Sequence, residues 1–118
     1  MKHFTKTDSA TKDGFIHVYE NIDAYALENR VHELMLGRGY KLKDGENGNG
    51  TYIRGIHVVR ILLGAFYNYF NWQIHVQSIG KIATVELSKK SSGMSGGVIG
   101  INQVKTELQF VSNMLKII

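Results

Sequence analysis

Two adjacent runs of alternating residues constrain the fold of this chain more than any other feature. Apolar and polar side chains alternate from Trp72 to Gln77 and again from Ala83 to Ser88, and a Gly80-centred turn separates the runs. Successive side chains of a strand point to opposite faces of a sheet, so this alternation is typical of strands with one buried face. The pattern therefore predicts an antiparallel β-hairpin.

A first helix is predicted between residues 23 and 37. Either Asn21 or Asp23 can cap its start, because both side chains accept hydrogen bonds from free backbone N–H groups. Gly37 and Gly39 can adopt the left-handed conformation that ends a helix. The apolar stripe of this helix is formed by Leu27, Val31, Leu34 and Met35.

A second helix is predicted from Val98 or Ile101 to Lys116. Its stripe is formed by Ile101, Val104, Leu108, Val111 and Leu115, and is widened by Phe110, Met114 and Ile117. A stripe this wide buries much of the helix. The helix therefore either packs deep on the sheet or covers a second molecule with part of its surface.

The remaining segments predict further strands. A run of β-formers at 15–19 follows Asp13-Gly14, and the strands at 40–43 and 51–53 flank a flexible hairpin loop from Asp44 to Gly50. Residues 56–70 fit either a helix or two strands that turn at Gly64-Ala65. We favour the two strands, because β-branched and aromatic residues dominate there.

The predicted order is strand, helix, about four antiparallel strands, helix. This predicts a single α+β domain over 1–118, in which two amphipathic helices pack on one face of the sheet and 1–13 is loosely ordered. By element order alone, the arrangement resembles the β-α-β4-α topology of TBP-like and helix-grip domains.

Composition narrows the class of protein. The chain has 118 residues, no cysteine for disulfides and no proline, so turns depend on residues such as its 13 glycines. The net charge is +4, with the excess in 41–90, which permits an anionic partner. The start lacks the apolar core of a signal peptide, and the longest apolar run, 61–67, is too short to span a bilayer. We therefore expect a cytoplasmic protein without membrane contact.

The glycine-rich stretch SSGMSGGVIGIN, residues 91–102, contains a G-x-S-x-G match at 93–97. A nucleophile elbow needs a parallel α/β sheet, and the chain is too short for a typical hydrolase core. Its glycines fit neither the G-x-x-x-x-G-K-[ST] spacing of a Walker phosphate loop nor the G-x-G-x-x-G spacing of a dinucleotide-binding loop. We interpret the stretch as a hinge between a strand and a helix. Exposed N–H groups at Ser95, Gly96 and Gly97 are a candidate anion site.

The titratable residues predict no catalytic or metal site and no cofactor. The five histidines lack the spacing of metal ligands within one element, although His17, His57 and His75 could meet across strands. No carboxylate pair accompanies any of them. We therefore expect a protein that is not an enzyme.

The aromatic run FYNYFNW, residues 66–72, is the richest candidate for binding. Aromatic rings on an open sheet face can bind a protein, a second copy of the chain, or stacked bases next to basic side chains. The candidate surface comprises Tyr52, Arg54, Tyr67, Tyr69 and Trp72. The sequence thus favours a small non-catalytic interaction module that can self-associate. The alternatives are a basic, aromatic-faced nucleic-acid-binding domain and a small-molecule or anion-binding domain that uses the glycine-rich loop.

Overall fold

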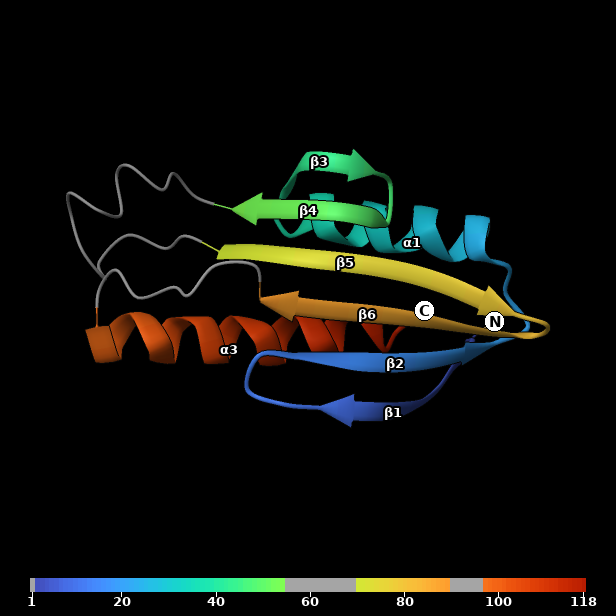
Figure 1. Ribbon diagram of the computed structural model, residues 1–118, viewed down its shortest axis with the longest axis horizontal. Helices are drawn as coiled ribbons and strands as arrows, with labels where there is room; N and C mark the ends of the chain where they lie inside the picture. Colours follow the sequence, from blue (N-terminus) through green and yellow to red (C-terminus); the bar gives the residue numbers. More distant parts are fainter. Residues whose placement is uncertain (1, 55–69, 90–96) are drawn as a thin grey trace.

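The computed structural model describes residues 2–54, 70–89 and 97–118, with backbone alone for 97–103 (Figure 1). Within these residues it contains six strands and two helices, a single α+β domain with an antiparallel sheet, as predicted. The strands lie in the order β1-β2-β6-β5-β4-β3. The elements are β1 (Phe4–Ala10), β2 (Gly14–Glu20), α1 (Ala24–Gly37), β3 (Lys41–Glu46), β4 (Asn49–Arg54), β5 (Phe70–Ile79), β6 (Ile82–Lys89) and α3 (Gly97–Leu115).

The predicted hairpin is confirmed and forms the centre of the sheet. Strands β5 and β6 pair from Trp72 opposite Lys89 to Ile79 opposite Ile82, and Gly80 in the connecting turn has a φ of 63°. Glycine adopts this left-handed conformation without steric cost. The alternation sets which side chains are buried: Trp72, Ile74 and Val76 lie inside, and the residues between them face outward.

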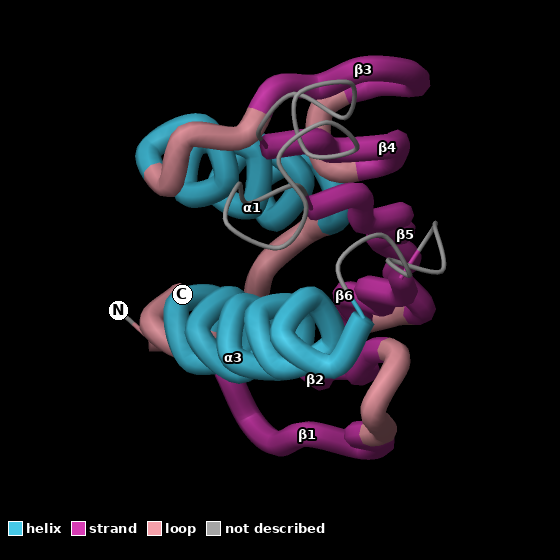
Figure 2. The backbone as a smooth tube through the Cα atoms, turned by 90° about the vertical axis from the view of Figure 1, so that its left-hand side faces the viewer, coloured by secondary structure: helices cyan, strands magenta, loops and turns pink. Residues whose placement is uncertain are grey.

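Both helices lie on the same side of the sheet (Figure 2). Asp23 is the N-cap of α1, because its Oδ1 accepts a hydrogen bond of 2.7 Å from the Ala26 N–H. Gly39, just beyond the end of α1, has a φ of 99°, as expected for a residue that ends a helix. The buried side chains that the helices contribute to the core are Leu27, Val31, Met35, Val104, Leu108, Val111 and Leu115.

The expectation that 1–13 is loosely ordered is wrong for Phe4–Ala10, which forms β1. This strand pairs with β2 at the edge of the sheet, and the N–H groups of His3 and Phe4 donate to the Ile118 carbonyl at 2.8 and 2.9 Å. Because an edge strand exposes most of its side chains, a mainly polar sequence can form one without an alternating apolar pattern. The described order therefore begins with one strand more than we predicted.

The hairpin of β3 and β4 is also tighter than the sequence indicated. Its strands continue to Glu46 and resume at Asn49, so the loop expected from Asp44 to Gly50 shrinks to Asn47 and Gly48. Gly48 has a φ of 74° and lies so close to Glu28 of α1 that a Cβ atom would overlap the helix backbone. The segment 56–69, for which we favoured two strands over a helix, lies outside the described residues, and Phe70 begins β5.

His17 of β2 is buried between the sheet and α3. Its Nε2 lies 3.0 Å from the Ser112 carbonyl oxygen, which can only accept, so Nε2 carries the proton and Nδ1 accepts from the Thr7 hydroxyl at 3.0 Å. Burial lowers the pKa of His17 below its ordinary value of 6.5; the hydrogen bond to Ser112 opposes this shift and the charge of Lys116 adds to it. The folded protein therefore holds His17 as a neutral side chain.

This arrangement predicts a loss of stability in mild acid. Below pH 6.5 the unfolded chain binds a proton at His17 more readily than the folded chain, so the free energy of unfolding falls until the pH reaches the folded pKa. We expect His17→Gln to reduce this fall. Urea titrations of the unmodified protein and this variant at pH 7.5 and 5.5 measure it; an undiminished fall in His17→Gln would contradict the assignment.

Candidate functional site

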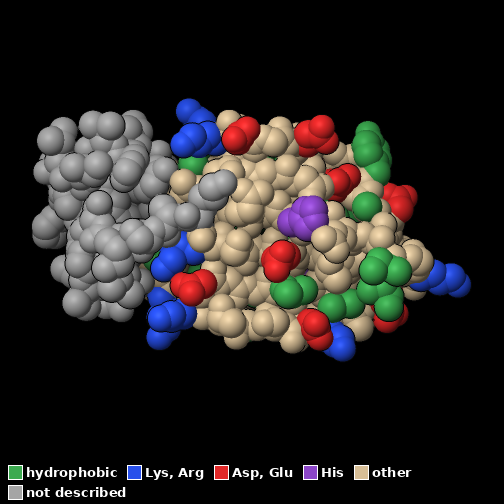
Figure 3. Space-filling view, viewed as in Figure 1, with side chains coloured by type: hydrophobic (Ala, Val, Ile, Leu, Met, Phe, Trp, Pro, Cys, Tyr) green, Lys and Arg blue, Asp and Glu red, His purple; other side chains and the backbone are tan. Residues whose placement is uncertain are grey.

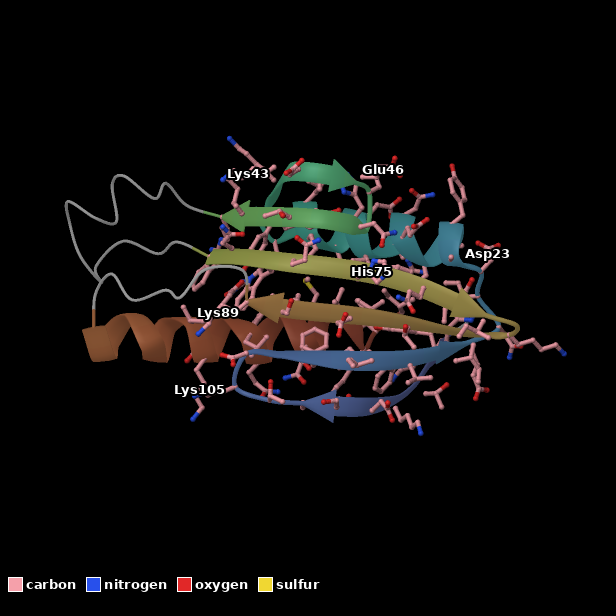
Figure 4. The ribbon with its side chains drawn as sticks, viewed as in Figure 1. Asp23, Lys43, Glu46, His75, Lys89 and Lys105 are labelled. Atoms are coloured by element: carbon pink, nitrogen blue, oxygen red, sulfur yellow. The ribbon has the colours of Figure 1, made fainter. Side chains whose placement is uncertain are left out.

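The face of the sheet opposite the helices is uncovered within the described part of the chain (Figures 1 and 2). We call the outward-facing residues of β5 and β6, with Ile16 and Val18 of β2, the open face. In the space-filling view, backbone and side chains that are neither charged nor hydrophobic form most of this surface (Figure 3), and His75, labelled in the same view in Figure 4, lies near its middle. The register places His75 directly opposite Glu86, and Glu86 directly opposite Ile16.

The centre of the open face is nearly free of charge. Among the outward residues of β5 and β6, only Glu86 carries a fixed charge, and none is Phe, Tyr or Trp. Ile79, at the tip of the hairpin, is 82% exposed, and Ile82 beside it is also exposed. These outward residues are Asn71, Gln73, His75, Gln77, Ile79, Ile82, Thr84, Glu86 and Ser88.

A small hollow of about 220 Å³ lies at the border of the open face, next to the turn between β1 and β2. The carboxylates of Asp13 and Glu86 contribute to its lining, together with hydroxyl groups. The Lys89 ammonium group lies 3.3 Å from Asp13 Oδ1 and pairs with it. Pockets for small organic ligands usually enclose about 300–1,000 Å³, so this hollow is small for such a ligand.

The structure places the predicted aromatic residues differently from our expectation. Tyr52 and Trp72 are fully buried on the helix-covered side, so the expected exposure of these two rings is wrong. The physical reason is strand parity, because Trp72 shares its face with Ile74, and Tyr52 lies directly opposite Trp72. Tyr67 and Tyr69 lie outside the described residues, and their role in an interaction surface stays a prediction.

The candidate anion site is only partly within the described residues. Gly97 is the first residue of α3, whereas Ser95 and Gly96 lie outside the described part of the chain. Anion binding at Ser95–Gly97 therefore stays a prediction. Arg54 ends β4 and faces the helix-covered side, where it joins a buried charge cluster.

The carboxylate of Glu107, on α3, is the centre of this cluster and is almost fully buried. Arg38, just beyond α1, donates to it from Nε and Nη2 at 3.2 and 2.8 Å. The Tyr40 hydroxyl donates to Oε2 at 2.8 Å, and Nη1 of Arg54 lies 3.4 Å from the same oxygen. Trp72 Nε1 donates to the Tyr40 hydroxyl at 2.7 Å. We call these five residues the Glu107 cluster.

The surroundings of Tyr40 and Arg38 favour the protonated form of each side chain. Burial raises the pKa of Tyr40 far above its ordinary value, and the negative charge of Glu107 raises it further, so the hydroxyl stays protonated and donates. The hydrogen bonds to Glu107 raise the pKa of Arg38. Arg38 also lies over the ring of Phe110, with its Cζ 3.6 Å from the ring centroid, an attractive cation–π geometry.

Sequence reasoning singled out Arg54 and Trp72, but for an exposed interaction surface, and it missed Arg38, Tyr40 and Glu107. A signal for Glu107 is present: it follows Val104 by three residues and precedes Val111 by four, so it lies within the apolar stripe of α3. By contrast, Phe110 and Ile117, which we expected to widen the buried stripe, are largely exposed. No comparable local pattern marks Arg38 or Tyr40, because their partner is distant in the chain.

Comparison of the chain with protein-family models, with curated proteins and with solved structures finds no match. In the described segments, no group of three or more His, Cys, Asp or Glu side chains is placed to hold a metal ion. Neither described helix combines the length and apolar character needed to cross a membrane. The candidate sites are therefore the open face and the Glu107 cluster.

Proposed function

We propose that this domain is a non-catalytic interaction module that binds another protein through the open face, and that this protein is a second copy of the chain. The observation that supports the proposal is the scarcity of charge at the centre of an uncovered sheet. Cores of protein interfaces are depleted in Lys, Glu and Asp, whereas charged residues are common at the rim and on ordinary surfaces.

The distribution of charge across the sheet fits this anatomy. Lys6 and Glu20 lie toward one border, opposite Val18 and Ile82 respectively, and Lys41 lies on the edge strand β3 at the other border. The centre between them consists of amides, hydroxyls, the imidazole of His75 and the single carboxylate of Glu86, with the exposed Ile79 and Ile82 at the hairpin tip. Amide and hydroxyl groups both donate and accept hydrogen bonds, so they can pair across an interface without net charge.

A second copy is the favoured partner because a two-fold interface sets the same surface against itself. A face with a strong net charge would repel its own copy, but a face with Glu86 as its central fixed charge does not. A two-fold axis near the His75–Glu86 pair would bring His75 of one protomer to Glu86 of the other. The same axis, parallel to the strands and between β5 and β6, would bring Gln77 of one protomer to Thr84 of the other and Gln73 to Ser88.

The proposal predicts a dimer that a central positive charge disrupts. Each chain has a mass of 13.3 kDa, so light scattering coupled to size exclusion should give a particle whose mass rises toward twice that value with concentration. Thr84→Arg adds a cation next to Gln77 and Val18 on each protomer. We expect this variant to be monomeric over the same range, because the axis would bring the two added cations, one from each protomer, close together.

Thr106→Arg is the matched control, since it makes the same change at an exposed position of α3, away from the sheet. It should dimerise like the unmodified protein. A monomer at every concentration would refute self-association. A dimer that survives Thr84→Arg would refute the open face as its interface.

The other functions considered from the sequence gain less support. Base stacking needs exposed aromatic rings, and the outward positions of β5 and β6 have none, so the described residues do not favour a nucleic-acid-binding face. The TBP-like or helix-grip topology remains part of the proposal: after β1, the order β2-α1-β3-β4-β5-β6-α3 supports it. The cytoplasmic location stays a prediction.

A further inference from the structure

The Glu107 cluster contains more positive than negative charge. Two guanidinium groups, of Arg38 and Arg54, share the carboxylate of Glu107, and within the described residues no other carboxylate is within ion-pair distance of either arginine. Arginine stays charged at any ordinary pH. One positive charge is therefore left without a partner at a partly buried position, where water screens it less than at a free surface.

The two arginines are held in place but keep donors available. Arg38 makes a bidentate contact with Glu107 and is packed against Phe110, and its side chain is still 29% exposed. Arg54 contacts the carboxylate more loosely, at 3.4 Å, and its side chain is 32% exposed. A guanidinium group has five N–H donors, of which Glu107 uses only some. Donors that are already positioned lose little conformational entropy when a ligand binds.

Further cations lie around the cluster. Lys43, Lys89 and Lys105 lie toward the end of the molecule where β4 ends and α3 begins, with Lys89 paired to Asp13, whereas Asp23 and Glu46 lie toward the other end (Figure 4). Such a concentration of like charge raises the local concentration of anions and their rate of association. The positive charge at this end therefore favours the binding of an anion by the two arginines.

We infer that Arg38 and Arg54 form a binding site for a small oxyanion, a carboxylate or phosphate group. The planar donor fork of arginine matches the oxygen geometry of both groups. The ligand would accept from the outward N–H groups of Arg54 and Arg38 and would neutralise the charge that Glu107 leaves uncompensated. This site is on the helix-covered side of the sheet. A result that refutes the oxyanion site therefore does not refute the proposal for the open face, and the reverse also holds.

The chain supplies its own reporter for this site. Trp72 is the only tryptophan, and its Nε1–H is joined to Glu107 through the Tyr40 hydroxyl. The indole N–H therefore gives one resonance in a ¹H–¹⁵N spectrum, next to the cluster. Titrations with inorganic phosphate and with succinate, at low ionic strength and constant pH, should each move this resonance if both oxyanions bind. Saturation with only one of them would identify which group the site takes.

Arg54→Gln tests the site with limited disturbance, because Arg38 and Tyr40 continue to bond Glu107. We expect it to weaken binding by about tenfold or more, the effect of losing a charged hydrogen bond. Lys105→Gln removes an exposed cation from the same end of the molecule and should change affinity by less than about twofold, as expected for weak surface electrostatics. Arg54→Lys keeps the positive charge but removes the planar donor fork of the guanidinium group. If Arg54→Gln does not fold, Arg54→Lys serves in its place, and we expect it to bind more weakly than the unmodified protein.

Three results would overturn the inference. The first is an indole resonance that does not move with either anion. The second is an equal loss of affinity in Lys105→Gln and Arg54→Gln, which would indicate diffuse charge attraction. The third is a shift caused by a single-stranded oligonucleotide but by neither small anion, which would assign the cations to a polymer.

Discussion

Glu107→Gln should lower the free energy of unfolding by about 3 kcal/mol. Breaking a buried ion pair by removing one partner typically costs about 3–5 kcal/mol, because the remaining charge is left without compensation. Glu107 is 4% exposed, whereas the side chains of Arg38 and Arg54 are about a third exposed, so water relieves part of this penalty and the low end of the range applies. Urea unfolding followed by the fluorescence of Trp72 measures the change.

The unfolding measurement on Glu107→Gln needs a control substitution and a buffer without phosphate. Glu33→Gln makes the same chemical change at an exposed position of α1 and should alter stability by less than about 0.5 kcal/mol. Glu107→Gln combined with Arg54→Gln should recover part of the loss, because one of the two uncompensated charges is then absent. The buffer should contain no phosphate, since a bound oxyanion would replace the missing carboxylate in part. Equal effects of the two Glu→Gln changes would rule out Glu107 as a stabilising centre.

Gly14→Ala is expected to destabilise the protein by about 3 kcal/mol, at the upper end of the cost of overpacking. Gly14 pairs with Ser88 where β2 meets β6. A Cβ atom at this position would overlap the Leu87 carbonyl oxygen and would lie 2.9 Å from the Ser88 Cα. These are backbone atoms, so relief requires β2 to move away from β6, and this pairing joins β1 and β2 to the rest of the sheet.

Gly37→Ala is the matched control for this substitution. Gly37 is the last residue of α1, and a Cβ atom there would have no atom within 4 Å. Alanine is the better helix former, so this variant should be more stable by about 0.5 kcal/mol. Thermal unfolding of the two variants should shift the midpoint in opposite directions. A Gly14→Ala protein as stable as the unmodified one would show that β2 and β6 are not packed this closely.

Local patterns predicted the elements that carry their own signal. The alternation around Ile74 and Val85 identified the central hairpin, and the cap at Asp23 with the stripe that includes Val31 identified α1. These signals are local because one buried face imposes its period on neighbouring residues. Strand β1 has no such signal: within it only Phe4 packs against the core, and its place depends on pairing with β2.

Local patterns predicted the candidate sites less well. The alternation that placed Trp72 with Ile74 already implied a buried ring, yet the density of aromatic residues suggested an exposed one. The glycine-rich stretch, whose G-x-S-x-G match is the most visible motif, lies outside the described residues except from Gly97 on. Neither the open face nor the Glu107 cluster corresponds to a sequence motif.

The sequence alone therefore determined the class of the fold, the central hairpin, both helices and the centre of their apolar stripes, because each depends on contacts between near neighbours or on a fixed period. Only the tertiary structure decided that Glu107 meets Arg38, Tyr40 and Arg54, residues more than 50 positions away, and that the centre of the open face is poor in charge. A charge cluster depends on which elements the topology brings together. No period along the chain encodes that proximity.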